Sequence, residues 1–165
     1  MTVVADASPL IFLGKIQWLA LIRRVLGDDV VVPQQIREEV LARPLDHAES
    51  VELERFLAAA CVERVDSPRD FAAGMSRTDD AAMTLAVRLE ADLLLTDDRT
   101  VRRLATVERI RPLGTLGVLL LALRRGLVDR AEVRRLVDDL VRSHGFRIGV
   151  ELYAAVIREI DGQGQ

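Results

Sequence analysis

Acidic residues at four places are the side chains best suited to chemistry in this chain of 165 residues. They are Asp6, Glu39, the pair Asp79-Asp80 and the pair Asp97-Asp98. Most of them follow, or nearly follow, a short apolar run of the kind that forms a buried strand. The carboxyl ends of parallel strands share one edge of a sheet, where ligands bind. Carboxylates gathered there repel each other unless a cation joins them. The pattern therefore predicts a site for Mg²⁺ or Mn²⁺, which prefer oxygen ligands.

Strands and helices alternate along the chain and must position these acids. Apolar runs predict strands over 2–5, 30–32, 62–65, 92–96 and 110–112. Helical spacing of apolar residues predicts helices over 8–15, 18–25, 33–42, 47–60, 79–90, 99–105, 116–125, 130–142 and 149–160. Ser8 is expected to cap the first helix, with Pro9 in its first turn, and Pro33 fits the first position of a later helix. The alternation predicts a three-layer α/β domain with a mainly parallel central sheet flanked by helices.

Helical periodicity distinguishes the neighbours Glu38 and Glu39. Glu39 comes three residues after Ile36, so it lies on the edge of the buried stripe of its helix. Glu38 points toward solvent on the same reasoning. Because carboxylates are seldom buried unless paired or bound to metal, Glu39 is the better candidate ligand.

The two aspartate pairs leave more than one interpretation open. Helical phase puts Asp79 on the inner face of its helix and Asp80 toward the boundary. Ser76 and Asp79 also have the spacing of a capping box, and acids in a first turn interact well with the helix dipole. Either Asp97 or Asp98 could cap the helix that follows. The choice of ligand within each pair stays open.

Charge is unevenly distributed, although the net charge is only −3. Five arginines follow the second aspartate pair and predict a basic rim beside the acidic centre: Arg99, Arg102, Arg103, Arg109 and Arg111. Three of them, Arg99, Arg102 and Arg103, are candidates to contact phosphates, although a solvated helix face explains them equally well. Lys15 is the only lysine.

Other functional classes fit poorly. Cys61 is the only cysteine, and His47 and His144 are isolated, so neither an intrachain disulfide nor a cysteine-based zinc site is expected. The phosphate-binding loop, dinucleotide, nucleophile-elbow and HExxH motifs are missing. The N-terminus does not resemble a signal peptide, and the apolar run 116–123 is too short to span a membrane. A cytoplasmic location is the default expectation.

Four motifs in order resemble the PIN-domain family, and more narrowly its VapC-like branch of toxin ribonucleases. They are VVADASPLIFLGKI (3–16), VPQQIREEV (32–40), TDDAAMTLA (78–86) and LLLTDDRTVRRLA (93–105). The later segments 114–128 and 145–160 also resemble that branch, so the match covers nearly the whole chain. Two positions depart from the branch pattern: Asp79 stands where Glu is usual, and Val101 stands where Gly is common.

The resemblance implies a single PIN-like domain over 1–165, with the helices at 130–160 as a family-specific extension. It implies metal-dependent hydrolysis of RNA, with Asp6, Glu39, Asp79 and the Asp97-Asp98 pair around Mg²⁺ or Mn²⁺. It also implies a small antitoxin partner and a homodimer. The main alternative is a catalytically weak or inactive PIN-like module that binds RNA or a partner. A receiver-like phosphoacceptor domain is disfavoured because no lysine follows a late strand.

Overall fold

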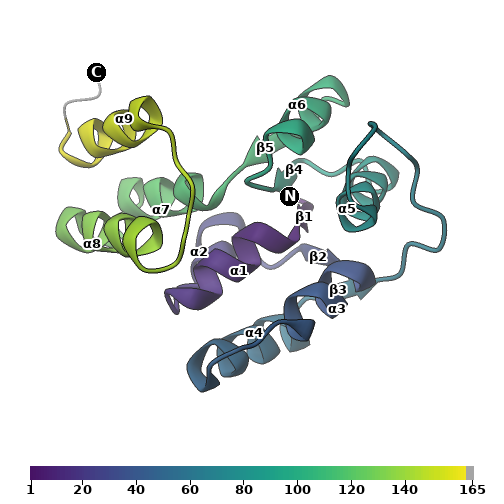
Figure 1. Ribbon diagram of the computed structural model, residues 1–165, viewed down its shortest axis with the longest axis horizontal. Coiled ribbons are helices and arrows are strands. Elements are labelled where there is room, and N and C mark those ends of the chain that lie inside the picture. The colour runs from purple at the N-terminus through teal and green to yellow at the C-terminus, as the bar shows by residue number, and fades with distance from the viewer. Residues whose placement is uncertain (163–165) are drawn as a thin grey trace.

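A five-stranded sheet, parallel throughout, forms the middle layer of the computed structural model, which describes residues 1–162 (Figure 1). The strands are β1 (Val3–Ala5), β2 (Val30–Pro33), β3 (Cys61–Glu63), β4 (Leu93–Leu95) and β5 (Arg111–Leu113). Their spatial order is β3-β2-β1-β4-β5. The predicted three-layer α/β architecture is therefore confirmed.

Helices cover both faces of this sheet (Figure 1). They are α1 (Ala7–Lys15), α2 (Leu21–Leu26), α3 (Gln34–Ala42), α4 (His47–Ala59), α5 (Arg77–Arg88), α6 (Arg99–Val107), α7 (Thr115–Arg124), α8 (Arg130–Arg142) and α9 (Val150–Ile160). Most lie within a few residues of the ranges predicted from periodicity. None of the helices in 1–162 is long and apolar enough to cross a membrane.

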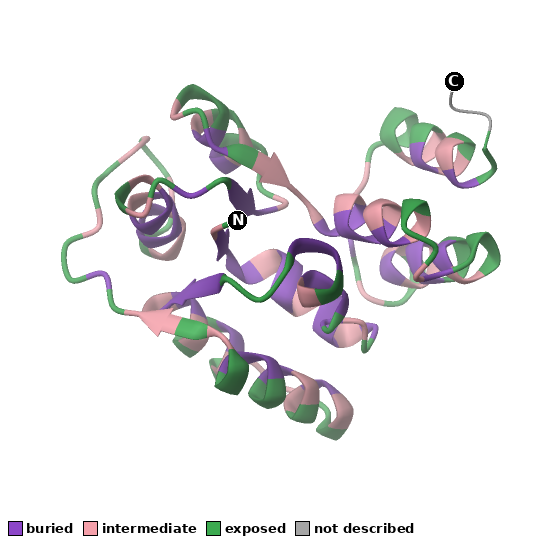
Figure 2. Ribbon diagram, turned by 180° about the vertical axis from the view of Figure 1, so that it is seen from behind, coloured by how far each residue is buried: buried purple, intermediate pink, exposed green. Residues whose placement is uncertain are grey.

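Burial on both faces explains why the three central strands, β2, β1 and β4, are apolar at every position. Val3 and Ala5 face the layer that contains α1 and α7, whereas Val4 faces the layer that contains α5 and α6. Figure 2 shows the central strands buried and the outer helix surfaces exposed. Residues of α8 and α9, such as Val137 and Ile160, belong to the same apolar core as Val3.

The strand order reverses direction between β1 and β4. The chain passes from β1 to β2 on one side of the sheet, while β4 pairs with β1 on the other side. Connections that leave two adjacent strands in opposite directions open the sheet edge at their carboxyl ends. The residues that follow β1 and β4 therefore meet at the topological switch point.

Two helix starts differ from the sequence prediction. Asp6, not Ser8, caps α1, because its carboxylate accepts a hydrogen bond from the N–H of Ala7 and the helix begins two residues early. Pro33 closes β2 and precedes α3, since its φ of −58° and ψ of 141° are extended rather than helical.

Candidate metal centre

Asp6 lies at the carboxyl end of β1 and is only 2 % exposed. Its backbone N–H donates to the carbonyl of Leu95 over 2.9 Å. Its Oδ1 accepts from the N–H of Ala7 over 2.7 Å, and its Oδ2 accepts from the hydroxyl of Thr96 over 2.8 Å. These contacts hold the carboxylate at the junction of β1 and β4.

Thr96 joins the acidic residues that follow these two strands. Its fully buried hydroxyl donates to Asp6 and accepts the backbone N–H of Asp98 over 3.2 Å. One side chain therefore positions two acidic segments. Sequence reasoning missed Thr96, although a polar residue closing the most apolar strand was a usable signal, because buried hydroxyls need partners.

The electrostatics of Asp6 show that other carboxylates lie nearby. The pKa of Asp6 is raised from 3.8 to about 7, with burial as the largest cause and the negative charge of Asp79 as the second. The hydrogen bonds from Thr96 and Ala7 oppose this rise. The charge of Glu39 on α3 adds a smaller increase. Acids from three separate segments therefore repel one another at this edge.

Asp79 connects this group to Asp98. Burial raises the pKa of Asp79, hydrogen bonds with Ser76 lower it, and the charges of Asp98 and Glu39 raise it again. Asp79 also forms the predicted capping box, since its backbone N–H donates to the Ser76 hydroxyl over 3.0 Å and its Oδ2 accepts from the Ser76 N–H over 3.4 Å. We call Asp6, Glu39, Asp79 and Asp98 the acidic centre.

Asp97 has a different environment from Asp98. Its Oδ1 accepts from the N–H of Thr115 over 2.8 Å, and its Oδ2 accepts from the Thr115 hydroxyl over 2.6 Å. Burial raises the pKa of Asp97, while the Thr115 hydrogen bonds and the charge of Arg102 lower it. A Cβ at Gly114 would lie 2.6 Å from Asp97 Oδ1, so only glycine lets the chain approach this closely. Asp97 thus ties the end of β4 to the start of α7.

This difference predicts that Asp98→Asn and Asp97→Asn have distinct metal responses. Both substitutions keep an oxygen for the existing backbone hydrogen bonds, at Thr100 and Val101 for Asp98 and at Thr115 for Asp97. We expect Asp98→Asn to remove most of the rise in Tm caused by Mg²⁺ or Mn²⁺, because a ligand that binds only the folded state stabilises it. Asp97→Asn should keep that rise, as measured by thermal unfolding. The reverse pattern would exchange the roles assigned to the two residues.

Asp80 departs from the position that helical phase predicted. It is 5 % exposed, whereas Asp79 is only partly buried. Its Oδ1 accepts from the N–H of Phe71 over 3.1 Å, and the N–H of Arg69 donates to the Thr84 hydroxyl over 2.8 Å. The segment before α5 therefore covers this side of the helix, and Asp80 anchors it beside an open hollow of about 460 Å³.

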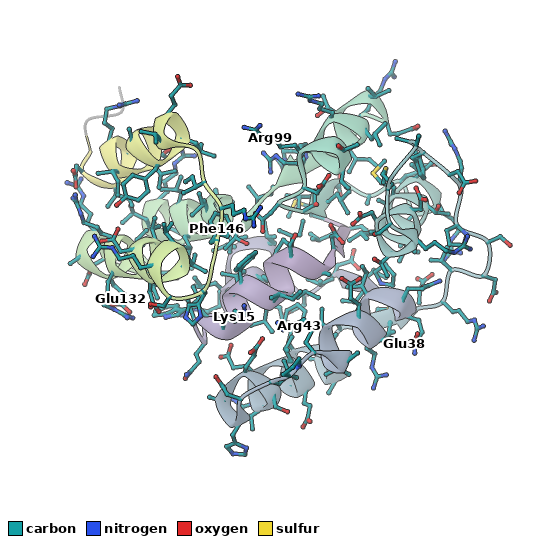
Figure 3. All side chains as sticks on the ribbon, in the orientation of Figure 1. Lys15, Glu38, Arg43, Arg99, Glu132 and Phe146 are labelled. Atoms are coloured by element: carbon teal, nitrogen blue, oxygen red, sulfur yellow. The ribbon has the colours of Figure 1, made fainter. Side chains whose placement is uncertain are left out.

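Glu38 and Glu39 are both exposed, so burial does not distinguish them. Their electrostatic roles do, because only Glu39 acts on the pKa of Asp6 and Asp79. Glu38 accepts a hydrogen bond from Gln34 Nε2 over 2.8 Å. Figure 3 shows Glu38 on the outer side of α3.

The basic rim is smaller than the sequence predicted. Arg99 and Arg103 are exposed on α6, and Arg102 Nη1 donates to the carbonyl of Thr96 over 3.3 Å. Arg109 and Arg111 lie instead at the amino end of β5, on the opposite edge of the sheet from the acidic centre. Arg109 and Arg111 are therefore not part of the basic rim, because the length of β5 separates them from the carboxyl edge of the sheet.

The donor chemistry of the acidic centre suits a hydrated divalent cation. Among residues 1–162, no basic side chain forms an ion pair with any of its four carboxylates. No three Asp, Glu, His or Cys side chains in this range stand close enough together to hold an ion directly. Mg²⁺ usually keeps several waters and takes one or two carboxylates, so spaced, uncompensated oxygens fit this ion.

Comparison with known proteins gives a family. A family model described as a PIN domain, DUF3368, matches residues 2–162, and the chain belongs to that family. PIN domains have a nuclease-type fold, are generally nucleases and typically use divalent metal ions. A search of curated proteins found no match.

Proposed function

We propose that this PIN-domain chain is a metal-dependent endoribonuclease that hydrolyses RNA phosphodiester bonds with Mg²⁺ or Mn²⁺. The observation that carries the proposal is the acidic centre. The charges of Asp79 and Glu39 raise the pKa of Asp6, and the charges of Asp98 and Glu39 raise that of Asp79. Within residues 1–162, no basic side chain forms an ion pair with these four carboxylates. We assign the hydrated metal to Asp6, Glu39, Asp79 and Asp98, with part of these contacts made through its bound waters, and leave Asp97 a structural role.

A bound metal would supply an acidified water and neutralise charge on the scissile phosphate. The protein's own groups prepare the site for that ion. Thr96 and the Ala7 N–H hold the Asp6 carboxylate in one orientation. Asp98 uses Oδ1 to cap α6. Glu39 is exposed, and within residues 1–162 its carboxylate accepts no hydrogen bond, so it is free to orient the attacking water.

Phosphate binding beside the acidic centre is assigned to α6. Arg99 and Arg103 are exposed, and Arg102 already reaches back to the Thr96 carbonyl. Guanidinium groups bind phosphate oxygens through paired N–H donors. These contacts would position the RNA backbone without selecting a base sequence.

Incubation of the purified protein with total RNA tests the proposal directly. We expect cleavage at defined positions with Mg²⁺ or Mn²⁺ and none with a chelator, mapped from the new RNA ends. RNA that stays intact under every metal condition, while still binding the protein, would instead support the binding-module alternative. One feature favours that alternative: Asp79 is shorter than the Glu usual in the VapC-like branch, and it is engaged in the capping box with Ser76.

We further propose that the chain acts as the VapC-like toxin of a cytoplasmic toxin–antitoxin pair and forms a homodimer. The antitoxin would place an Arg or Lys in the acidic centre, where a cation relieves the repulsion between carboxylates. Expression of this chain alone should then slow growth, and Asp6→Asn should relieve the slowing. Growth curves at matched protein levels measure this effect. Equal harm from the variant would show that the toxicity does not arise from the acidic centre.

A further inference from the structure

The hollow beside the start of α5, here called the loop hollow, has a buried carboxylate in its wall. Residues 70–75, from the long segment between β3 and α5, line it together with Asp80 (Figure 1). Asp80 is only 5 % exposed. The volume of about 460 Å³ lies within the range of about 300–1,000 Å³ that small-molecule sites have. The loop hollow is therefore large enough to hold a small organic group against the Asp80 carboxylate.

Asp80 has hydrogen-bonding capacity that the protein does not use. Its Oδ1 accepts from the N–H of Phe71 over 3.1 Å. Within residues 1–162, its Oδ2 accepts no hydrogen bond, and Asp80 forms no ion pair. Buried polar groups normally have hydrogen-bond partners, and an ionised carboxylate offers about four lone-pair positions. A ligand that donates N–H groups to Asp80 would supply the missing partners.

The other residues of the wall favour a flat, neutral group. Phe71, Ala72 and Met75 are apolar and half-buried, whereas Asp70 is an exposed carboxylate. The negative charges of Asp70 and Asp80 repel a phosphate. The loop hollow therefore suits an uncharged ring with apolar faces and N–H donors on its edge.

A tight turn fixes the shape of this wall. The N–H of Met75 donates to the carbonyl of Ala72 over 3.3 Å, and Gly74 between them has a φ of 85°. Glycine takes this conformation without steric cost, as the third residue of such a turn requires. The wall is thus preformed and does not depend on a ligand for its conformation.

The loop hollow adjoins the acidic centre along the chain at two points. Asp80 directly follows Asp79, and consecutive Cα atoms are about 3.8 Å apart. Met75 directly precedes Ser76, whose hydroxyl accepts from the Asp79 N–H over 3.0 Å. A group bound in the loop hollow would therefore lie beside the carboxylates that are assigned to the metal.

We propose that the loop hollow is a base pocket that selects a guanine close to the RNA bond to be cut, with Asp80 as the specificity-determining residue. The inference rests on the proposed ribonuclease function. Guanine carries two N–H donors side by side on its Watson–Crick edge, at N1 and N2, which match the two oxygens of a carboxylate. Adenine and cytosine have a bare ring nitrogen next to the amino group, and uracil has one N–H between two carbonyls. Proteins read unstacked RNA bases by hydrogen bonds to this edge.

RNA binding by full-length Asp6→Asn protein, which is expected not to cleave, tests the pocket. The probes are single-stranded RNAs of about 10 nucleotides, made of uridine alone, with one guanosine, or with one inosine, which lacks the N2 amino group. With Mg²⁺ present, the guanosine RNA should bind about tenfold more tightly than the uridine RNA, as a paired contact to a base edge typically discriminates. Inosine should lose most of this preference.

Adding Asp80→Asn should abolish the preference for guanosine. The Asn oxygen still accepts from the Phe71 N–H, while its amide group opposes the guanine donors. Asp129→Asn is the matched control, because the Asp129 carboxylate also accepts a backbone N–H, that of Glu132 over 2.8 Å, at the start of α8. This control should keep the preference. Thermal unfolding checks the fold of each variant, and the inosine comparison needs no change at Asp80.

Equal affinity for the guanosine and uridine RNAs would overturn the base pocket, and so would a preference that survives Asp80→Asn. Both results would leave the ribonuclease proposal intact. Failure of the wild type to cut any RNA with metal would instead overturn the proposed function.

Discussion

Replacing Asp6 by Asn should abolish RNA cleavage and the metal-induced rise in Tm, yet make the metal-free protein more stable near pH 8. Burial and the charge of Asp79 raise the pKa of Asp6 to about 7. The folded state then binds this proton more tightly than the unfolded state does. Wild-type stability should fall as the pH rises from about 4 to about 7 and level off above that range. The shift from 3.8 to about 7 corresponds to at most about 4 kcal/mol.

The Asn side chain preserves the contacts of Asp6, so the effect isolates its charge. Its oxygen can accept from the Ala7 N–H, and its amide can donate to Thr96, whose hydroxyl reverses direction. Asp46→Asn is the control, because Asp46 also caps a helix through its carboxylate, on α4, away from the acidic centre. Denaturant unfolding between pH 4 and pH 8, with and without Mg²⁺, measures the effect. Parallel pH profiles for wild type and Asp6→Asn would refute the buried charge at this site.

Glu39→Gln should reduce the rate of RNA cleavage by on the order of 10²-fold or more, since Glu39 is assigned to the attacking water and to the metal. Glu38→Gln should change the rate by no more than about twofold, as expected for a surface residue outside the site. The two side chains are adjacent on α3, and both are exposed. Only Glu39 acts electrostatically on Asp6 and Asp79. Initial rates on one defined RNA give the comparison.

The metal-free stability of these two variants supplies a second measurement. Removing the charge of Glu39 relieves repulsion at Asp6 and Asp79, so Glu39→Gln should unfold at a slightly higher temperature than wild type without metal. Glu38→Gln should instead lose part of its contact with Gln34 and gain nothing. Similar losses of activity in both variants would mean that Glu39 has no special place in the acidic centre.

The ends of the predicted strands were sufficient to place Asp6 and the Asp97-Asp98 pair at one edge of the sheet. Short apolar runs predicted the strands, and alternation with helices predicted a parallel sheet, because buried parallel strands need apolar side chains on both faces. In a parallel sheet, Asp6 and the residues after β4 must therefore lie at the same carboxyl edge. This part of the candidate site depends on local hydrophobic pattern and on strand order, and both can be predicted from the sequence.

The choice between adjacent acids depended on partners distant in sequence. Asp97 and Asp98 both follow β4, but the position of Thr115 at the start of α7 engages Asp97 alone. Asp80 is buried because the segment containing Phe71 folds over α5. Helical periodicity predicts which face of a helix packs on the core, but it does not show which other segment of the chain packs over the remaining faces.

The contacts of Thr96 and of the segment 143–149 between α8 and α9 were likewise decided by tertiary structure. The Thr96 hydroxyl bonds to Asp6, 90 residues away in sequence, only because β1 and β4 are neighbours in the sheet. Phe146 reaches Phe12 only because α8 returns the chain toward α1. The sequence by itself determined which chemistry gathers at the sheet edge, since strand order and burial follow from apolar patterning. Three-dimensional packing decided which carboxylates keep their charge available, because hydrogen bonds between distant segments engage some of them and not others.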